Sequence, residues 1–227
     1  MSLGDALRLT PAKQAEGKQS LLFQDAPGLP SRYLPMLSFH PHHRAGTSTV
    51  SFALYMEPKA IFIHEWRSEG NPYRTGPVIH VQNGRLTGVK GLDLALPLQK
   101  WVRFELSAVI GDAVTGRWNL KVTPAGEATK EFKGLPCRHP DMKTLDWVGF
   151  ISNANEKTEF YLDDLAILTD DPARADEYAA GHSALGYADR DSEIEVMSRP
   201  PGMQMIEHMP PAFDPHQFRL VVRFQQN

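Results

Sequence analysis

The chain has 227 residues, 22% of them charged, a formal net charge of -3 and one cysteine. This length suits one large β domain, or one medium domain with a tail, and buries enough surface to fold without a disulfide or a metal. Scattered lysines and arginines argue against a nucleic-acid partner, no apolar run reaches the roughly 18 residues that span a bilayer, and one cysteine excludes an intramolecular disulfide.

The first strand is predicted over residues 20–24. A segment rich in proline and histidine, residues 27–46, follows it and is predicted to be a long crossover loop, as Greek-key and jelly-roll topologies require. From residue 49 onward apolar and polar side chains alternate, and this period of two predicts strands with one buried face. The predicted strands cover residues 49–56, 60–67, 78–82, 85–89, 101–109, 117–123, 129–132 and 160–168.

Two local signals refine this pattern. Asn83-Gly84 separates two of the strands, and this dipeptide tolerates the two positive φ angles of a type I′ turn, so it predicts a tight hairpin. At Asp163-Asp164 the apolar phase slips by one residue, which predicts a β-bulge. Many short strands without intervening helices predict an all-β fold, an antiparallel two-sheet β-sandwich.

The character of the chain changes after Leu168, so we expect a β-sandwich domain over residues 1–169 and a C-terminal extension over residues 170–227. Asp171-Pro172 is typical of a helix start and predicts a short helix over residues 173–180. Residues 198–215 are rich in Pro and Met and read as irregular. Residues 218–224 alternate again and predict a last strand that joins the sandwich edge, pairs with another chain as a homo-oligomer, or begins a further domain.

Three segments resemble the opening, central and closing strands of one known superfamily: GKQSLLFQD at residues 17–25, WVRFEL at 101–106 and FYLDDLAI at 160–167. They are similar to the concanavalin A-like lectin/glucanase superfamily, and most of all to jelly-roll modules of bacterial polysaccharide-processing proteins. The resemblance covers residues 6–168 and implies a module that binds or acts on glycans.

The chain departs from the enzymes of that superfamily. The glycosidases carry acidic residues in the order E-x-D-x-x-E on one strand, and this chain has no such cluster. Some alginate lyases carry an Arg-Ser-Glu strand and a Gln-x-His strand. Arg67-Ser68-Glu69 and His80-Val81-Gln82 echo these, but the second runs in the reverse order and the closing Tyr/Lys motif is missing.

The strand at residues 60–67 carries large side chains on both faces, which predicts a central strand that is covered on both sides. A hairpin centred near Pro72 sets His64 opposite His80 and Trp66 opposite Val78, on one surface. The ligand-binding surface expected from this register comprises His64, Trp66, Arg67, Tyr73, Arg74, His80 and Gln82. The alternative places Trp66 in the core, pairs Glu65 with Arg67 and makes the histidines packing residues. Trp118 and Trp147 are expected in the core.

No organic cofactor is expected. The resemblance implies a structural Ca²⁺ near the closing strand, for which Asp25 and Asp163 are the expected ligands, since a hard cation prefers oxygen. The alternative is a bulge with solvated carboxylates.

Three functions follow from these observations. The first is a non-catalytic glycan-binding module with a polysaccharide partner, and the second is a structural or assembly module that uses the final strand. The third is a polysaccharide lyase or glycoside hydrolase, in which Arg67 and Arg74 neutralise a carboxylate and a histidine or Tyr73 moves the proton. Residues 1–5 carry no signal peptide, and export to the periplasm or the exterior is expected only if a signal lies outside this chain.

Overall fold

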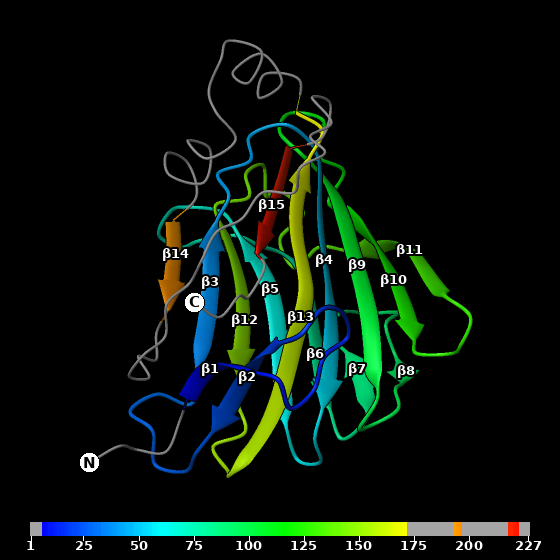
Figure 1. Ribbon diagram of the computed structural model, residues 1–227. Helices are drawn as coiled ribbons and strands as arrows, with labels where there is room; N and C mark the ends of the chain where they lie inside the picture. Colours follow the sequence, from blue (N-terminus) through cyan, green and yellow to red (C-terminus); the bar gives the residue numbers. More distant parts are fainter. Residues whose placement is uncertain (1–5, 172–192, 197–217, 223–227) are drawn as a thin grey trace.

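The computed structural model describes residues 6–171, 193–196 and 218–222, and these form only strands and their connections. The strands make two antiparallel sheets, called here sheet A and sheet B (Figure 1). Helices long and apolar enough to cross a membrane do not occur in the part of the chain that the structure describes.

Sheet A has eight strands. In spatial order seven of them are β1 (Ala6–Thr10), β2 (Ser20–Asp25), β13 (Thr158–Thr169), β4 (Gly46–Met56), β9 (Trp101–Ile110), β10 (Arg117–Pro124) and β11 (Lys130–Pro136). The eighth, β15 (Phe218–Val222), pairs with the last part of β13, beyond the part that pairs with β2.

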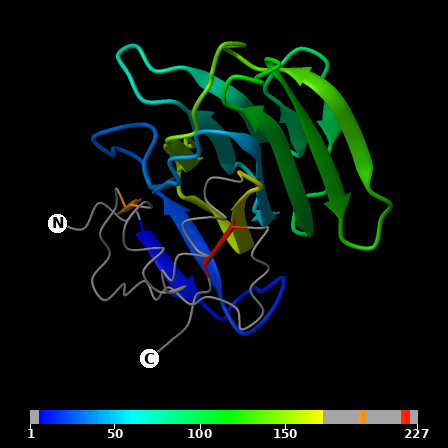
Figure 2. The ribbon, with the colours of Figure 1, turned by 90° about the horizontal axis from the view of Figure 1, so that it is seen from above.

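Sheet B has seven strands, in the order β14 (Glu193–Val196), β3 (Met36–His40), β12 (Trp147–Ser152), β5 (Ile61–Arg67), β6 (Thr75–Gln82), β7 (Arg85–Thr87) and β8 (Leu94–Ala95). Figure 2 shows the layers end-on, with the green strands β9, β10 and β11 in one layer and the cyan strands β5 and β6 in the other. Strands that are distant in sequence, such as β2 and β13, lie side by side, which requires the crossover connections of a jelly roll.

The core lies between the facing sides of the two sheets, where aromatic rings interlock. Phe52 of β4 stacks on Phe104 of β9 at 5.2 Å between centroids, and meets Phe150 of β12 edge-on at the same distance. Phe62 of β5 meets Phe160 of β13 in the same way at 5.2 Å. Such offset and edge-to-face pairs are the favoured geometries of aromatic contacts, so one apolar layer joins the sheets.

The structure confirms several sequence predictions and corrects one. Asn83 and Gly84 have φ values of 50° and 68°, as a type I′ turn requires, and the register of β13 against β4 shifts between Asp163 and Ala166, which is the predicted bulge. The final strand joins its own sandwich as β15. The prediction of a loop over residues 27–46 is wrong, because β3 lies inside it and pairs with β12. The helix predicted over residues 173–180 lies outside the described residues.

Candidate functional site

The register of β5 against β6 differs by one residue from the predicted one. Ile63 opposes His80 and His64 opposes Ile79, and the register shifts again between Glu65 and Arg67. A one-residue offset turns every side chain of a strand to the other face. The prediction that His64, Trp66 and His80 share one surface is therefore wrong: His80 lies on the face of sheet B that points away from sheet A, called here the outer face, and the other two side chains point into the core.

His64 and Trp66 form a polar pair inside the core, and both are fully buried. Trp66 Nε1 donates to His64 Nε2 at 3.0 Å, and His64 Nδ1 lies 2.9 Å from the carbonyl oxygen of Gly149. These contacts require a neutral imidazole with its proton on Nδ1, and burial lowers the pKa of His64 to about 3. The two residues satisfy each other and present no atom to a ligand.

The outer face of sheet B instead carries a stacked group of Arg67, Tyr73 and Trp147, called here the Arg67 patch. The guanidinium carbon of Arg67 lies 4.0 Å from the ring centre of Trp147 and 4.5 Å from that of Tyr73. Arg67 Nε also donates to Glu65 Oε1 at 2.8 Å. Tyr73 is 47% exposed, one of two large hydrophobic side chains exposed in the described part of the chain. The patch thus presents aromatic surface beside a fixed cation.

Trp147 belongs to this face because of its place in β12. It opposes Arg67, while Val148, its neighbour in sequence, points inward and is fully buried. The prediction that Trp147 lies in the core is wrong, whereas Trp118 is buried as expected. Gly149 opposes Glu65 on the same face and leaves the space that the indole occupies.

His80 and Arg138 extend the outer face beyond the patch. His80 is half-buried, and burial lowers the pKa of its imidazole, with the nearby Arg138 acting in the same direction and Glu65 opposing it. His80 is therefore neutral at pH 7. Arg138 is exposed, and no carboxylate pairs with it among the residues the structure describes. Its backbone N–H donates to Gly76 O at 3.1 Å, which fixes the segment after β11 beside the start of β6.

The remaining predicted ligand residues lie at the margins of this face. Arg74 is exposed, with Nε 3.4 Å from Asp141 Oδ2. Gln82 is exposed and opposes Ile61. Neither side chain hydrogen-bonds to the Arg67 patch. The candidate surface therefore keeps three of the predicted residues, Arg67, Tyr73 and His80, and gains Trp147 and Arg138, which the fold brings to the same face.

A buried carboxylate, Asp146, anchors the end of the face next to the patch. Burial opposes its ionisation, but hydrogen bonds from Thr144 Oγ1, Glu69 N and Arg44 hold its pKa below the usual range. His42 Nδ1 lies 3.5 Å from Asp146 Oδ1 and 3.7 Å from Glu69 Oε1. These three side chains could supply the ligand atoms of a metal site, but Asp146 is already paired with Arg44. We read Asp146 as a structural acceptor that ties the loop after β5 to the start of β12.

The structure does not bring Asp25 and Asp163 together. Asp25 opposes Thr158, five residues before Asp163 on β13, which is about 16 Å along a strand. Asp25 accepts hydrogen bonds from Ser152 Oγ and from the amides of Ala26 and Ala154. Asp163 accepts from the amides of Ala15, Glu16 and Asp164. One calcium ion cannot contact both carboxylates in this arrangement, and each already serves as an acceptor for the protein.

Comparison with known proteins gives the fold a context. No family model matches the sequence, and no curated protein does. The endo-β-1,4-glucuronan lyase of the fungus Trichoderma reesei is similar in structure, with a TM-score of 0.53 and 11% identity over 72% of this chain and 86% of that one. The PL-14 alginate lyase of Aplysia kurodai has a TM-score of 0.51 and 9% identity over 72% and 87%. The chain thus has the concanavalin A-like jelly-roll fold.

Proposed function

We propose that this chain is a non-catalytic carbohydrate-binding module and that its binding surface is the outer face of sheet B around the Arg67 patch. The stacking of Arg67 on Tyr73 and Trp147 carries the proposal, because it fixes two aromatic rings on one accessible face. Sugar sites use an aromatic ring as an apolar platform and nearby polar groups to select hydroxyls or carboxylates.

The charges of this face favour an acidic polysaccharide. Arg67 is neutralised by Glu65, but Arg138 is an exposed cation beside the neutral His80. An Arg guanidinium pairs well with a carboxylate, since its N–H groups match the two oxygens. The two similar structures are lyases of glucuronan and alginate, which are both polymers of uronic acids.

Affinity electrophoresis through gels that contain glucuronan, alginate or a neutral polysaccharide tests this proposal. We expect the two acidic polymers to retard the protein, and Tyr73→Ala to weaken retardation about tenfold. Tyr33→Ala is the matched control: Tyr33 is 51% exposed but precedes β3, at the end of sheet B opposite the loop that carries Tyr73. Equal retardation of the Tyr73 and Tyr33 variants, or none for the wild type, contradicts the proposed surface.

The neutral His80 favours one second candidate, a polysaccharide lyase. In β-elimination a base takes the proton next to the carboxylate, the electron pair forms a carbon–carbon double bond, and the glycosidic oxygen leaves with a proton. A neutral imidazole can serve as that base, and Arg138 can pair with the carboxylate. Ultraviolet absorbance of the unsaturated product, lost in His80→Gln, would establish this activity. If neither glucuronan nor alginate yields such a product, only the proposed binding function remains.

The assembly alternative has less support. It needs a final strand that is free to pair with another chain, but β15 pairs with β13 of its own sandwich. Sedimentation of the full chain as a monomer would agree with this pairing.

A further inference from the structure

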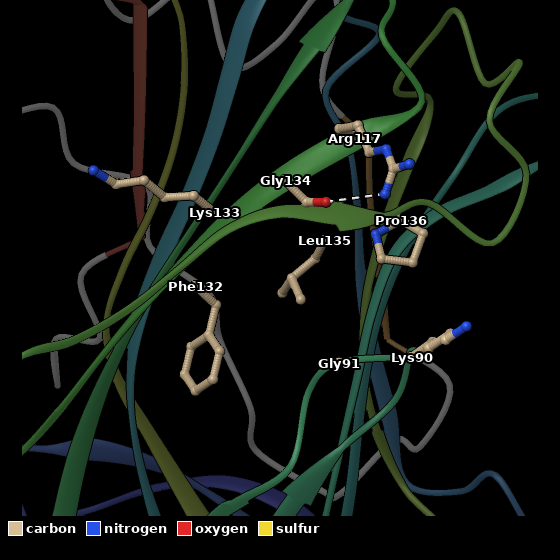
Figure 3. Close-up of a pocket in the computed structure, with 8 residues that line it drawn as sticks. All are labelled: Lys90, Gly91, Arg117, Phe132, Lys133, Gly134, Leu135 and Pro136. Carbon is tan, nitrogen blue, oxygen red and sulfur yellow. Dashed lines mark hydrogen bonds between the residues drawn. The ribbon is translucent and has the colours of Figure 1, made fainter.

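A cavity lies at the β11 edge of sheet A. It has a volume of about 610 Å³, within the range of roughly 300–1,000 Å³ that is common for ligand pockets. Its walls come from β11, from Arg117 of β10 and from Lys90-Gly91, which follow β7 of sheet B. We call this cavity the edge slot (Figure 3).

The floor of the slot is apolar. Phe132 and Leu135 point from β11 into the space in front of the Lys90-Gly91 backbone (Figure 3). A bulge allows this: Trp118 opposes Leu135 but Leu120 opposes Phe132, so one extra residue in β11 brings both side chains to the same side. The backbone of Gly91 lies opposite Leu135: a Cβ at Gly91 would stand 3.9 Å from Leu135 Cδ2, an ordinary van der Waals contact.

The rim of the slot is cationic. Of the eight lining residues three are Lys or Arg and none is acidic, although the whole chain has a net charge of -3. Lys133 extends away from the floor and lies 3.5 Å from Glu131. Lys90 and Arg117 have no carboxylate partner among the described residues; Arg117 Nη1 donates only to Gly134 O, at 3.2 Å. The slot therefore combines apolar walls with two cations whose charge is not balanced.

From this combination we infer that the edge slot binds small organic anions that carry an apolar ring, with the anionic group on Lys90 and Arg117 and the ring on Phe132 and Leu135. Apolar walls with a few convergent polar groups are the usual composition of a small-molecule site. The inference concerns a different ligand and different residues from the proposed glycan surface, so either can fail without the other.

Titration of ¹⁵N-labelled protein, followed by NMR, tests the inference with 2-naphthoate as the probe. We expect saturable shifts of the amides of Gly91, Phe132 and Gly134. Lys90→Gln and Arg117→Gln should each weaken binding about tenfold, whereas Lys18→Gln, which removes an exposed lysine from the loop before β2, should leave it unchanged. Each variant's amide spectrum also reports whether it is folded.

Two further probes separate the two parts of the site. The neutral 2-naphthamide should bind at least tenfold more weakly than 2-naphthoate, and acetate, an anion without a ring, should produce no saturable shift. Equal affinity for the acid and the amide, equal shifts with acetate, or naphthoate shifts that fall outside the slot would each overturn the inference.

Discussion

The indole of Trp147 lies across Gly149, so closely that a Cβ on residue 149 would stand 1.8 Å from its Cη2. Glycine is needed here for space, since its φ is not in the left-handed region that would require it for conformation. The contact lays the ring flat along β12 and turns its face to Arg67, whose guanidinium lies 4.0 Å from it. The orientation of the aromatic surface therefore depends on one absent methyl group.

We predict that Gly149→Ala forces the indole off the sheet and lowers the free energy of unfolding by about 1–3 kcal/mol, the usual cost of overpacking. Binding to acidic polysaccharide should weaken as well. The Trp147→Ala background provides the control, because it removes the clashing ring. There Gly149→Ala should cost much less, so urea denaturation of the four proteins should give a coupling energy above about 1 kcal/mol. Additive losses would mean that the methyl group clashes with something other than Trp147.

Because His64 is buried, we predict that the free energy of unfolding falls as the pH is lowered below about 6.5. Its pKa is about 3 in the folded protein and about 6.5 when exposed, so between these values the unfolded chain binds one more proton. Stability from this group is complete above pH 6.5 and is lost as the pH falls, by about 1.4 kcal/mol per pH unit. Urea denaturation between pH 4.5 and 7.5 measures this slope.

His64→Gln isolates the contribution, since an amide can donate to Gly149 O and accept from Trp66 Nε1 without titrating. The variant should be less stable at pH 7, because Gln lacks the ring that packs 4.7 Å from Phe150. Its stability should depend on pH less steeply than that of the wild type, by about one proton. Parallel pH profiles for the two proteins would show that His64 does not titrate with unfolding.

Much of the sandwich could be predicted from the sequence because its signals are local. Alternation marked β4, β9 and β10, whose one face is buried, and Asn83-Gly84 marked the hairpin. The strand β3 was not predicted because it is short, follows several prolines and is stabilised by its pairing with β12. Local patterns cannot reveal a strand that long-range pairing stabilises.

The candidate site was predicted only in part, for a related reason. Opposite the segment from Glu65 to Arg67, β6 has one extra residue, at Gly76-Pro77. This bulge shifts the register of β5 against β6 by one residue. Arg67, Tyr73 and His80, which share the hairpin, lie on the outer face, whereas His64 and Trp66 point into the core. Trp147 was expected in the core and Arg138 was not singled out, because both come from segments about 70 residues further along the chain. Gly149, two residues after Trp147, was the one available signal for the place of the indole.

Arg67→Lys keeps the charge of the patch and should still weaken glycan binding about tenfold. A lysine ammonium cannot lie flat against the rings of Tyr73 and Trp147, so it would not hold the two rings in place. The free energy of unfolding should change by less than about 1 kcal/mol, since lysine keeps a cation beside the buried Glu65 carboxylate. Arg85→Lys is the control, because Arg85 of β7 makes a similar two-point pair with Asp93, without an aromatic ring stacked on it. Equal effects of the two substitutions on binding would exclude a specific role for the stack.

Asp25 should stabilise the fold without calcium. Its carboxylate, 1% exposed, connects β2 to the end of β12 through Ser152 Oγ and the amide of Ala154. Asp25→Ala leaves these buried donors without an acceptor, which costs about 1–3 kcal/mol for each group that water cannot reach. Asp112→Ala, which removes a fully solvated carboxylate paired with Lys143, should leave stability unchanged. Thermal unfolding of the wild type should have the same midpoint in calcium and in chelator, because three protein donors already occupy the Asp25 oxygens. A midpoint that rises with calcium in the wild type and not in Asp25→Ala would instead assign Asp25 to a cation.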